Sequence, residues 1–347
     1  TFFNLLEENN LCESYRIETF VSSKTVSYAI TELYSQKDKY DLKTYNNLLK
    51  GLSAILNKVI EYEEKESICG PNRKSYYKTD HDATAMALKA DYYAGLGTHM
   101  HAAYNTQILV IKGIVFSYYV SQSRNDMDDF IPILEEFNRL YGRFPKNVCA
   151  DAGYGSLANY EYINKNNIGN YVKFISWEGN VSGSDPDCYR LNNDDTITCL
   201  NDLIGYQVDI EGRHHKKAKS VFYRIDGCNE CVYKMYCMKY NKNTELNYKI
   251  FEVVPNLIRY KQQAEDNLLS VKGIEIRVNR SIQVEGVFGN EKQNRNYSRV
   301  RRRGLSKVST EAMLVLLGLN IKKLFKFYDA KSKNKFWIAP NDLQPET

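Results

Sequence analysis

The chain has 347 residues, of which 43% are hydrophobic and 26% charged, and its net charge at pH 7 is +5. These fractions are ordinary for a globular protein and exclude long disordered tracts, while the length allows one large domain with an insertion or two domains. No run reaches the roughly 20 apolar residues that a membrane-spanning helix needs, and no secretion signal opens the chain, so we expect a cytoplasmic protein without membrane contact. Eight cysteines, three of them bunched, indicate metal binding or reduced thiols more than a disulfide framework.

Residues 1–78 are predicted to be mostly helical. Apolar side chains recur at helical spacing between Leu42 and Val59, and the Gly-Pro-Asn sequence at residues 70–72 ends the pattern. We expect a helical hairpin packed on the core, although a plain interaction helix is equally consistent with the pattern.

Residues 79–175 change to an alternating α/β pattern. Two β-rich runs, residues 107–111 and 114–120, flank Lys112 and Gly113 and predict an antiparallel hairpin. An apolar stripe over residues 130–141 predicts a helix, with Asp126 as its N-cap and Gly142 as its end.

A strand that ends on Asp151 follows, then a helix capped by Ser156 and reaching about Asn166, and then a strand over residues 171–175. Hairpin, helix, strand, helix and strand in this order predict an α/β fold with a mixed sheet. Functional groups in such sheets collect at the C-terminal ends of parallel strands, where Asp151 is expected to lie.

The alternation of helices and strands ends at residues 176–265, which are predicted to be an insertion with a small β-structure of its own. The insertion contains five of the eight cysteines. Two long helices are expected after it, over residues 271–296 and 306–328, and residues 266–330 would complete the core. A basic linker separates these helices, and residues 331–347 form a tail.

Two carboxylates are the candidate catalytic groups. Asp151 stands beside Gly153 and Gly155, which would leave room for a metal ion and a phosphate, although an aspartate that only begins a turn fits the same pattern. Glu285 lies on a predicted helix with Gly286, a residue that costs a helix on the order of 1 kcal/mol against alanine. A strand-end carboxylate and a helical one can meet over a divalent metal, as in enzymes that cut and join nucleic acid strands.

Lys292 lies two helical turns beyond Glu285 on the same face, where it could bind a phosphate. A surface glutamate with a solvated lysine is the alternative interpretation of this pair.

Five stretches of the chain resemble, in the same order, the DDE transposases of bacterial insertion sequences. They are residues 79–84, 103–107, 150–155, 284–292 and 303–308. The resemblance extends from about residue 40 to the C-terminus, and five ordered matches are far more specific than any one of them.

The resemblance implies an RNase H-like catalytic core of mixed sheet and flanking helices, with an insertion before the final glutamate. Asp151 would be the second acidic residue of the catalytic triad, Glu285 the third, and Lys292 the lysine that follows it. Such enzymes use two Mg²⁺ ions to cut transposon ends and join them to target DNA. The implied partner is double-stranded DNA, bound by a homo-oligomer.

The chain departs from the family at the first acidic residue of the triad, since no strand ending in aspartate is recognisable within residues 1–78. Asp80 and Asp82 follow in an expected loop and are not candidates. Arg280 stands one residue off the commoner spacing to the glutamate. We therefore expect a fragment or a decayed copy that begins after the first strand, and a catalytically inactive DNA-binding remnant is the alternative function.

Two further groups of residues are candidate binding sites. Four cysteines could form a zinc site, of which one half has the usual C-x₂-C spacing, although cysteines are often only small buried hydrophobes. They are Cys199, Cys228, Cys231 and Cys237. A run of cations after the presumed catalytic helix is predicted to contact DNA phosphates, although such a run is usually a solvated surface. Its members are Lys292, Arg295, Arg299, Arg301, Arg302 and Arg303.

Overall fold

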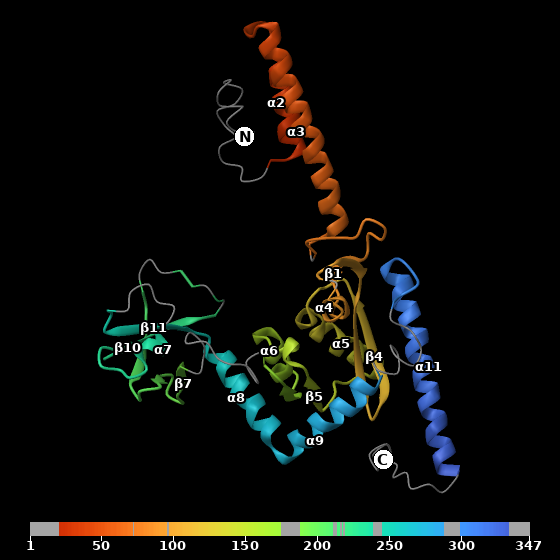
Figure 1. Cartoon of the computed structure of the whole chain (residues 1–347), viewed down its shortest axis with the longest axis vertical. Coiled ribbons are helices and arrows are strands. Elements are labelled where there is room, and N and C mark those ends of the chain that lie inside the picture. Colours follow the sequence, from red (N-terminus) through yellow and green to blue (C-terminus); the bar gives the residue numbers. More distant parts are fainter. Residues whose placement is uncertain are drawn as a thin grey trace. The chain divides into compact units, whose positions relative to one another are not determined.

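The computed structural model describes most of the chain and divides it into two compact units, Thr1–Ala103 and Tyr104–Thr347 (Figure 1). The described residues are 21–71, 73–95, 97–174, 188–210, 214–215, 217, 219–238, 245–287 and 299–332. The compact units divide after Ala103, and the predicted domain boundary after residue 78, where the catalytic core was expected to begin, stays a prediction.

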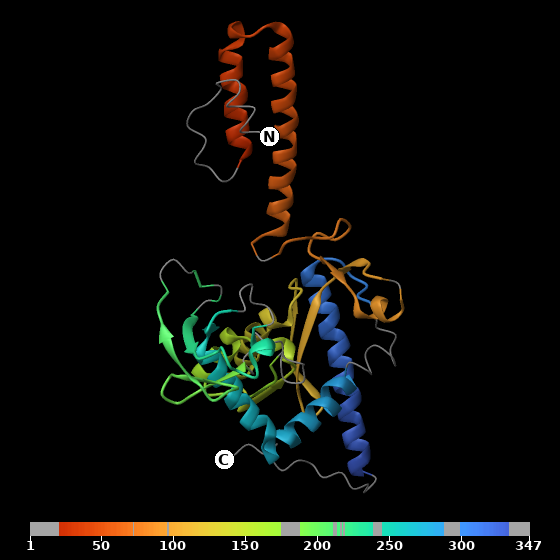
Figure 2. The same ribbon diagram turned by 60° about the vertical axis from the view of Figure 1, so that its left-hand side comes forward.

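The first unit is built on a helical hairpin, α2 (Ser23–Ser35) and α3 (Leu42–Cys69), whose helices lie side by side (Figure 2). Val26, Leu33 and Leu52 are fully buried where the helices pack. Asp41 caps α3 by accepting hydrogen bonds from the next backbone amides, and Gly70, at φ 67°, ends it. The predicted hairpin is confirmed for the described residues.

Shorter elements complete the first unit. They are the 3₁₀ turn η2 (Lys37–Lys39), α4 (Lys89–Tyr93) and the antiparallel strands β1 (Thr84–Ala87) and β2 (Met100–Ala103).

The second unit opens with the predicted hairpin, β3 (Asn105–Ile111) and β4 (Ile114–Ser121). Lys112 and Gly113 both have positive φ angles, 54° and 77°, as a two-residue type I′ turn requires. The predicted helix follows as α5 (Asp126–Tyr141), which packs against both strands. Its N-cap is Asn125 and not Asp126, because the carboxylate of Asp126 accepts hydrogen bonds from β3 side chains instead.

A parallel strand pair follows α5, as the sequence predicted. The paired strands are β5 (Asn147–Ala150) and β6 (Gly169–Val172), and the 3₁₀ turn η3 (Ala152–Tyr154) and the helix α6 (Leu157–Lys165) connect them. The Ser156 hydroxyl caps α6 by accepting from the Asn159 amide, 3.2 Å away. The strand expected over residues 171–175 begins two residues earlier.

The predicted mixed sheet does not form as one sheet among the described residues. The hairpin β3–β4 and the pair β5–β6 are two separate two-stranded sheets. Side-chain packing connects them in place of backbone hydrogen bonds: Phe130 and Leu134 of α5 are buried in one core with Val172 of β6 and Leu109 of β3. The structure is thus a mixed α/β fold.

The predicted small β-structure of the insertion is a five-stranded antiparallel sheet in the order β7-β8-β9-β10-β11. Its strands are β7 (Tyr189–Leu191), β8 (Ile197–Cys199), β9 (Ile204–Val208), β10 (Val221–Asp226) and β11 (Tyr248–Val253), with the short helix α7 (Lys234–Cys237) before β11. Helix α8 (Pro255–Leu269) begins immediately afterwards, in residues that the sequence assigned mostly to the insertion.

The described residues after α8 form three helical segments, α9 (Val271–Arg280), the π-helical turn η5 (Ser281–Glu285) and α11 (Leu305–Ser332). The long helix predicted over residues 271–296 is thus interrupted after Arg280, and its second half lies largely outside the described residues. Helix α11 runs along β4 (Figure 1), where Val308 and Leu316 are buried. The Asn320 side chain bonds both backbone groups of Val115, at 2.9 and 2.7 Å. No helix in the described parts of the chain is long and apolar enough to cross a membrane.

Candidate active site

Asp151 lies directly after the last residue of β5, and 59% of its side chain is exposed. Its Oδ2 atom accepts a hydrogen bond from Nη2 of Arg280 at 2.6 Å, although the two residues are 129 positions apart. The Arg280 side chain is only 21% exposed, so this ion pair is partly shielded from water. The contact brings the end of α9 to the end of β5.

The turn that connects Arg280 to Glu285 is π-helical. In an α-helix, two positions five residues apart point about 140° away from each other, because one turn takes 3.6 residues. The i→i+5 repeat of a π-helix instead brings such positions close to one face, and single π-turns recur at functional sites. The backbone of η5 therefore places position 285 near the face of position 280, which contacts Asp151. The side chain of Glu285 lies outside the described residues.

The same π-turn accounts for an irregularity in the sequence. The resemblance to DDE transposases left Arg280 one residue off the commoner spacing to Glu285. A π-turn accommodates one extra residue within a helix without moving the flanking positions to different faces. The structure thus gives a physical reason why the altered spacing is compatible with the same arrangement.

A polar cluster beside Asp151 was not predicted as a site. Gln107, only 5% exposed, donates to Oδ1 of Asp126 at 3.0 Å and to Asn105 at 3.1 Å, and it accepts a hydrogen bond from the Tyr154 hydroxyl. Burial raises the pKa of Tyr154, and the charges of Asp126 and Asp151 raise it further, so this hydroxyl stays a proton donor. The sequence contained one signal that could have identified this cluster, the stretch at residues 103–107 that resembles the transposases.

Asp129 extends this cluster into the core. Its carboxyl group is 2% exposed and accepts a hydrogen bond from the Ser121 hydroxyl at 2.6 Å. Burial raises the pKa of Asp129 to about 6, against the lowering effect of hydrogen bonds from Ser121 and Gln107.

Packing requires glycine at only one of the two glycine positions after Asp151. A Cβ atom on Gly155 would lie 2.7 Å from the Lys173 carbonyl oxygen and 2.9 Å from the Tyr160 hydroxyl, so close packing against β6 requires glycine here. A Cβ atom on Gly153 would make only an ordinary contact, 3.6 Å from Asp126. Internal packing therefore explains Gly155 without a ligand.

The predicted DNA-contacting cations are described only in part. Arg299, Arg301, Arg302 and Arg303 are exposed. The carboxylate of Glu311, on α11, accepts the backbone amides of Arg301 and Arg302 at 2.9 Å each. This contact fixes the backbone of the segment and directs it along the start of α11. Lys292 and Arg295 lie outside the described residues.

The four predicted zinc ligands line one small cavity of about 20 Å³ in the insertion. Burial raises the pKa of Cys228, and the neighbouring thiols of Cys231, Cys199 and Cys237 raise it further. Among the described residues, no three histidine, cysteine or acidic side chains are already arranged around a single metal position. The cavity therefore gathers the thiols without a complete coordination sphere.

Fold and site together define a mixed α/β protein with a carboxylate at a strand end, a glutamate-bearing helix paired to it, and an exposed arginine-rich segment. Residues 203–325 match the family model described as a transposase DDE domain. This match confirms the resemblance to DDE transposases seen in the sequence. It includes Arg280, Glu285 and the arginine-rich segment, whereas Asp151 lies before it. No curated protein and no solved structure matches the chain.

Proposed function

We propose that this chain is a metal-dependent transposase that cleaves DNA at the ends of an insertion sequence and joins those ends to target DNA. In this proposal Asp151 and Glu285 are the catalytic carboxylates. The observation that supports it most is the ion pair between Arg280 and Asp151, which brings the helix of Glu285 to the end of β5.

The residues at this position suit a divalent cation. Carboxylate oxygens are the ligands that Mg²⁺ prefers, and 59% of the Asp151 side chain is exposed. Asp151 and Glu285 would hold Mg²⁺, which supplies Lewis-acid stabilisation of the phosphodiester oxygens and an activated nucleophile. The resemblance implies a third acidic residue, which remains unassigned.

The other residues of the site would orient the Asp151 carboxylate and bind the DNA. Arg280 holds the Asp151 carboxylate in place and adds positive charge where a phosphate would approach. The arginines of residues 299–303 would contact the DNA backbone, and such contacts give sequence-independent, salt-sensitive binding. A homo-oligomer on DNA belongs to the same proposal.

A cleavage assay tests the proposal. The substrate is double-stranded DNA carrying the inverted repeats that flank the gene, with Mg²⁺ or Mn²⁺ added. Asp151→Asn and Glu285→Gln should each lower the cleavage rate by at least about 100-fold. Each substitution removes a ligand of the metal ion, which stabilises the transition state by several kcal/mol, and each 1.36 kcal/mol lost is tenfold in rate. Asp195→Asn is the matched control, since Asp195 is 64% exposed and also ion-paired with an arginine, Arg259.

The control should cleave at the wild-type rate. Salt-dependent DNA binding without cleavage at any Mg²⁺ or Mn²⁺ concentration would contradict the proposal and support the inactive DNA-binding remnant.

A further inference from the structure

Four cysteines from three separate segments of the chain line one cavity of the insertion. Cys199 ends β8, Cys228 and Cys231 lie in the turn after β10, and Cys237 is the last residue of α7. The four cysteines come together only through the pairing of β8, β9 and β10. A cavity of about 20 Å³ is large enough for a single small ion or water molecule.

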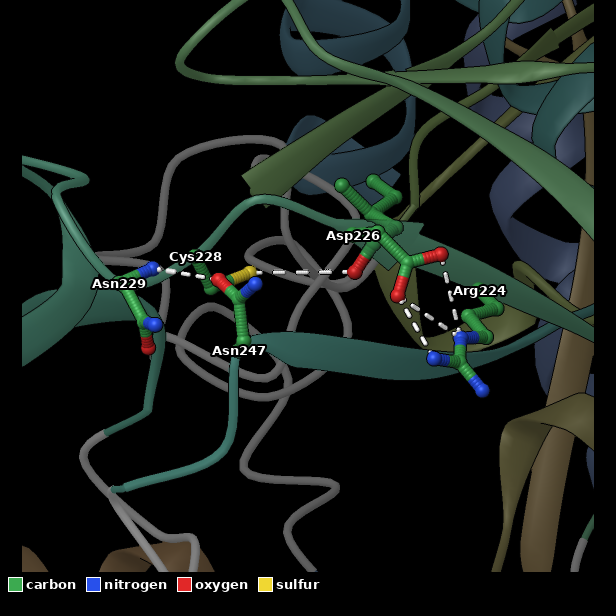
Figure 3. A network of polar contacts seen from close by, with 6 residues as sticks. Arg224, Asp226, Cys228, Asn229 and Asn247 are labelled. Atoms are coloured by element: carbon green, nitrogen blue, oxygen red, sulfur yellow. Dashed lines mark hydrogen bonds and ion pairs between the residues drawn. The ribbon is translucent and has the colours of Figure 1, made fainter.

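The turn with Cys228 is hydrogen-bonded to Asn247, the residue directly before β11 (Figure 3). The Asn247 carbonyl accepts the amides of Gly227 and Cys228, at 2.9 and 3.0 Å, and the Asn247 side chain accepts the amide of Asn229 at 3.0 Å. Gly227, at φ 90°, adopts a conformation that favours glycine. The Cys228 thiol adds a hydrogen bond of its own, donated to the Ile225 carbonyl at 3.8 Å, so both backbone and side-chain contacts position this turn.

The turn after Cys199 directs a backbone amide at the cysteine sulfur. The backbone amide of Asn201 donates a hydrogen bond to Sγ of Cys199 at 3.4 Å, and the Asp202 amide donates to the Cys199 carbonyl at 3.0 Å. Amide-to-sulfur hydrogen bonds of this kind are typical of the second sphere around metal-bound cysteines.

Two lysines also line the cavity, Lys234 and Lys249. Lys249 is only 8% exposed, its ammonium group donates to the Cys237 carbonyl, and it lies 4.8 Å above the ring of Phe251. A purely apolar cysteine cluster would gain nothing from a buried ammonium group, whereas a centre of negative charge would. Four thiolates around a divalent cation carry a net charge of −2, which two lysines offset.

We propose that Cys199, Cys228, Cys231 and Cys237 bind one Zn²⁺ ion, which serves as a structural site of the insertion. Binding converts four thiols and one Zn²⁺ ion into a tetrathiolate complex and releases four protons. The ion would connect β8, the turn after β10 and α7, a helix of four residues. The thiols would rotate about χ1 to close the tetrahedron, which leaves the backbone in place.

The zinc content of the full chain tests this proposal. The protein is purified under reducing conditions without chelator, and zinc is measured by elemental mass spectrometry. We expect about one zinc per chain, and at least a tenfold lower content in the Cys228→Ser, Cys231→Ser double variant. Cys69→Ser is the matched control, since this free cysteine lies on α3 in the first unit and should not change the zinc content.

A second measurement covers the case in which the double variant does not fold. The zinc-free wild-type chain is titrated with Co²⁺, and a spectrum of tetrahedral thiolate coordination with a one-to-one endpoint is expected. The proposal is overturned by less than about 0.1 zinc per chain both as purified and after reconstitution with Zn²⁺. Equal zinc loss in Cys69→Ser, or disulfides among the four cysteines after purification, would also overturn it. None of these results depends on DNA cleavage.

Discussion

The buried carboxyl group of Asp129 makes the stability of the second unit depend on pH. Its pKa is raised from 3.8 to about 6, chiefly by burial. The folded chain therefore holds this proton more tightly than the unfolded chain, so the stabilisation is present at low pH and is lost as the pH rises from 3.8 through about 6. At 1.36 kcal/mol per pKa unit, the loss amounts to about 3 kcal/mol, of which about 1.4 kcal/mol falls between pH 5 and pH 8.

The substitution Asp129→Asn tests this value, because an amide has the shape of the protonated acid and cannot ionise. It should stabilise the region around α5 by about 1.4 kcal/mol more at pH 8 than at pH 5. Any change in packing or in the hydrogen bond from Ser121 is common to both pH values and cancels in this difference. Asp128→Asn is the matched control, since Asp128 is exposed in the same helical turn.

Urea unfolding followed by pulsed hydrogen exchange is the suitable assay, since peptides from α5 and β4 report on this region and a chain of two compact units need not unfold in one step. Equal stabilisation by Asp129→Asn at both pH values, or a smaller effect at pH 8, would refute the reasoning. So would a matching pH dependence for Asp128→Asn.

Three further predictions concern two glycines, the Arg280 side chain and the arginine-rich segment. Gly155→Ala should lower the free energy of unfolding around β6 by about 1–3 kcal/mol, because its Cβ atom would lie 2.7 Å from a carbonyl oxygen. Gly286→Ala should be neutral or stabilising by up to about 1 kcal/mol, because no described atom lies within 4 Å of the new Cβ atom. Equal effects of the two substitutions in urea unfolding would contradict this prediction. Arg280→Gln should change stability by less than about 1 kcal/mol but lower the cleavage rate, and an unchanged rate would remove the main support for the proposed site. Replacing Arg301, Arg302 and Arg303 by alanine should reduce the slope of log affinity for DNA against log salt by about 3, as measured by fluorescence anisotropy, and an unchanged slope would show that these side chains do not contact phosphates.

Much of the local structure could be predicted because its causes lie within a few residues. The hairpin β3–β4 followed from two β-rich runs around Lys112 and Gly113, whose φ angles are those of the expected turn. The end of α5 at Gly142 and the cap of α6 by Ser156 were predicted for the same reason. The N-cap of α5 was predicted wrongly, since the Asp126 side chain bonds distant residues instead of its own helix.

Features that depend on distant segments could be predicted only in outline. The sequence suggested that the four cysteines share a site, and the structure brings them to one cavity. The convergence of Asp151 and Glu285 stays a prediction, to which the structure adds the ion pair with Arg280 and the π-turn between residues 281 and 285. Nothing in the local composition indicated that turn, because a π-turn reflects the fit of one helix against its neighbours.

By itself, the sequence determined the order and type of most elements, the place of the strand-end aspartate and the likeness to DDE transposases. Caps, turns and apolar periodicity act between residues a few positions apart, so they can be recognised without knowledge of the fold. Only the tertiary structure decided that, within the described residues, the expected mixed sheet is two separate strand pairs, that Asp151 meets Arg280 across 129 positions, and that Gly155 is required by packing. These outcomes depend on which surfaces exclude water together, and that is a property of the packed chain as a whole.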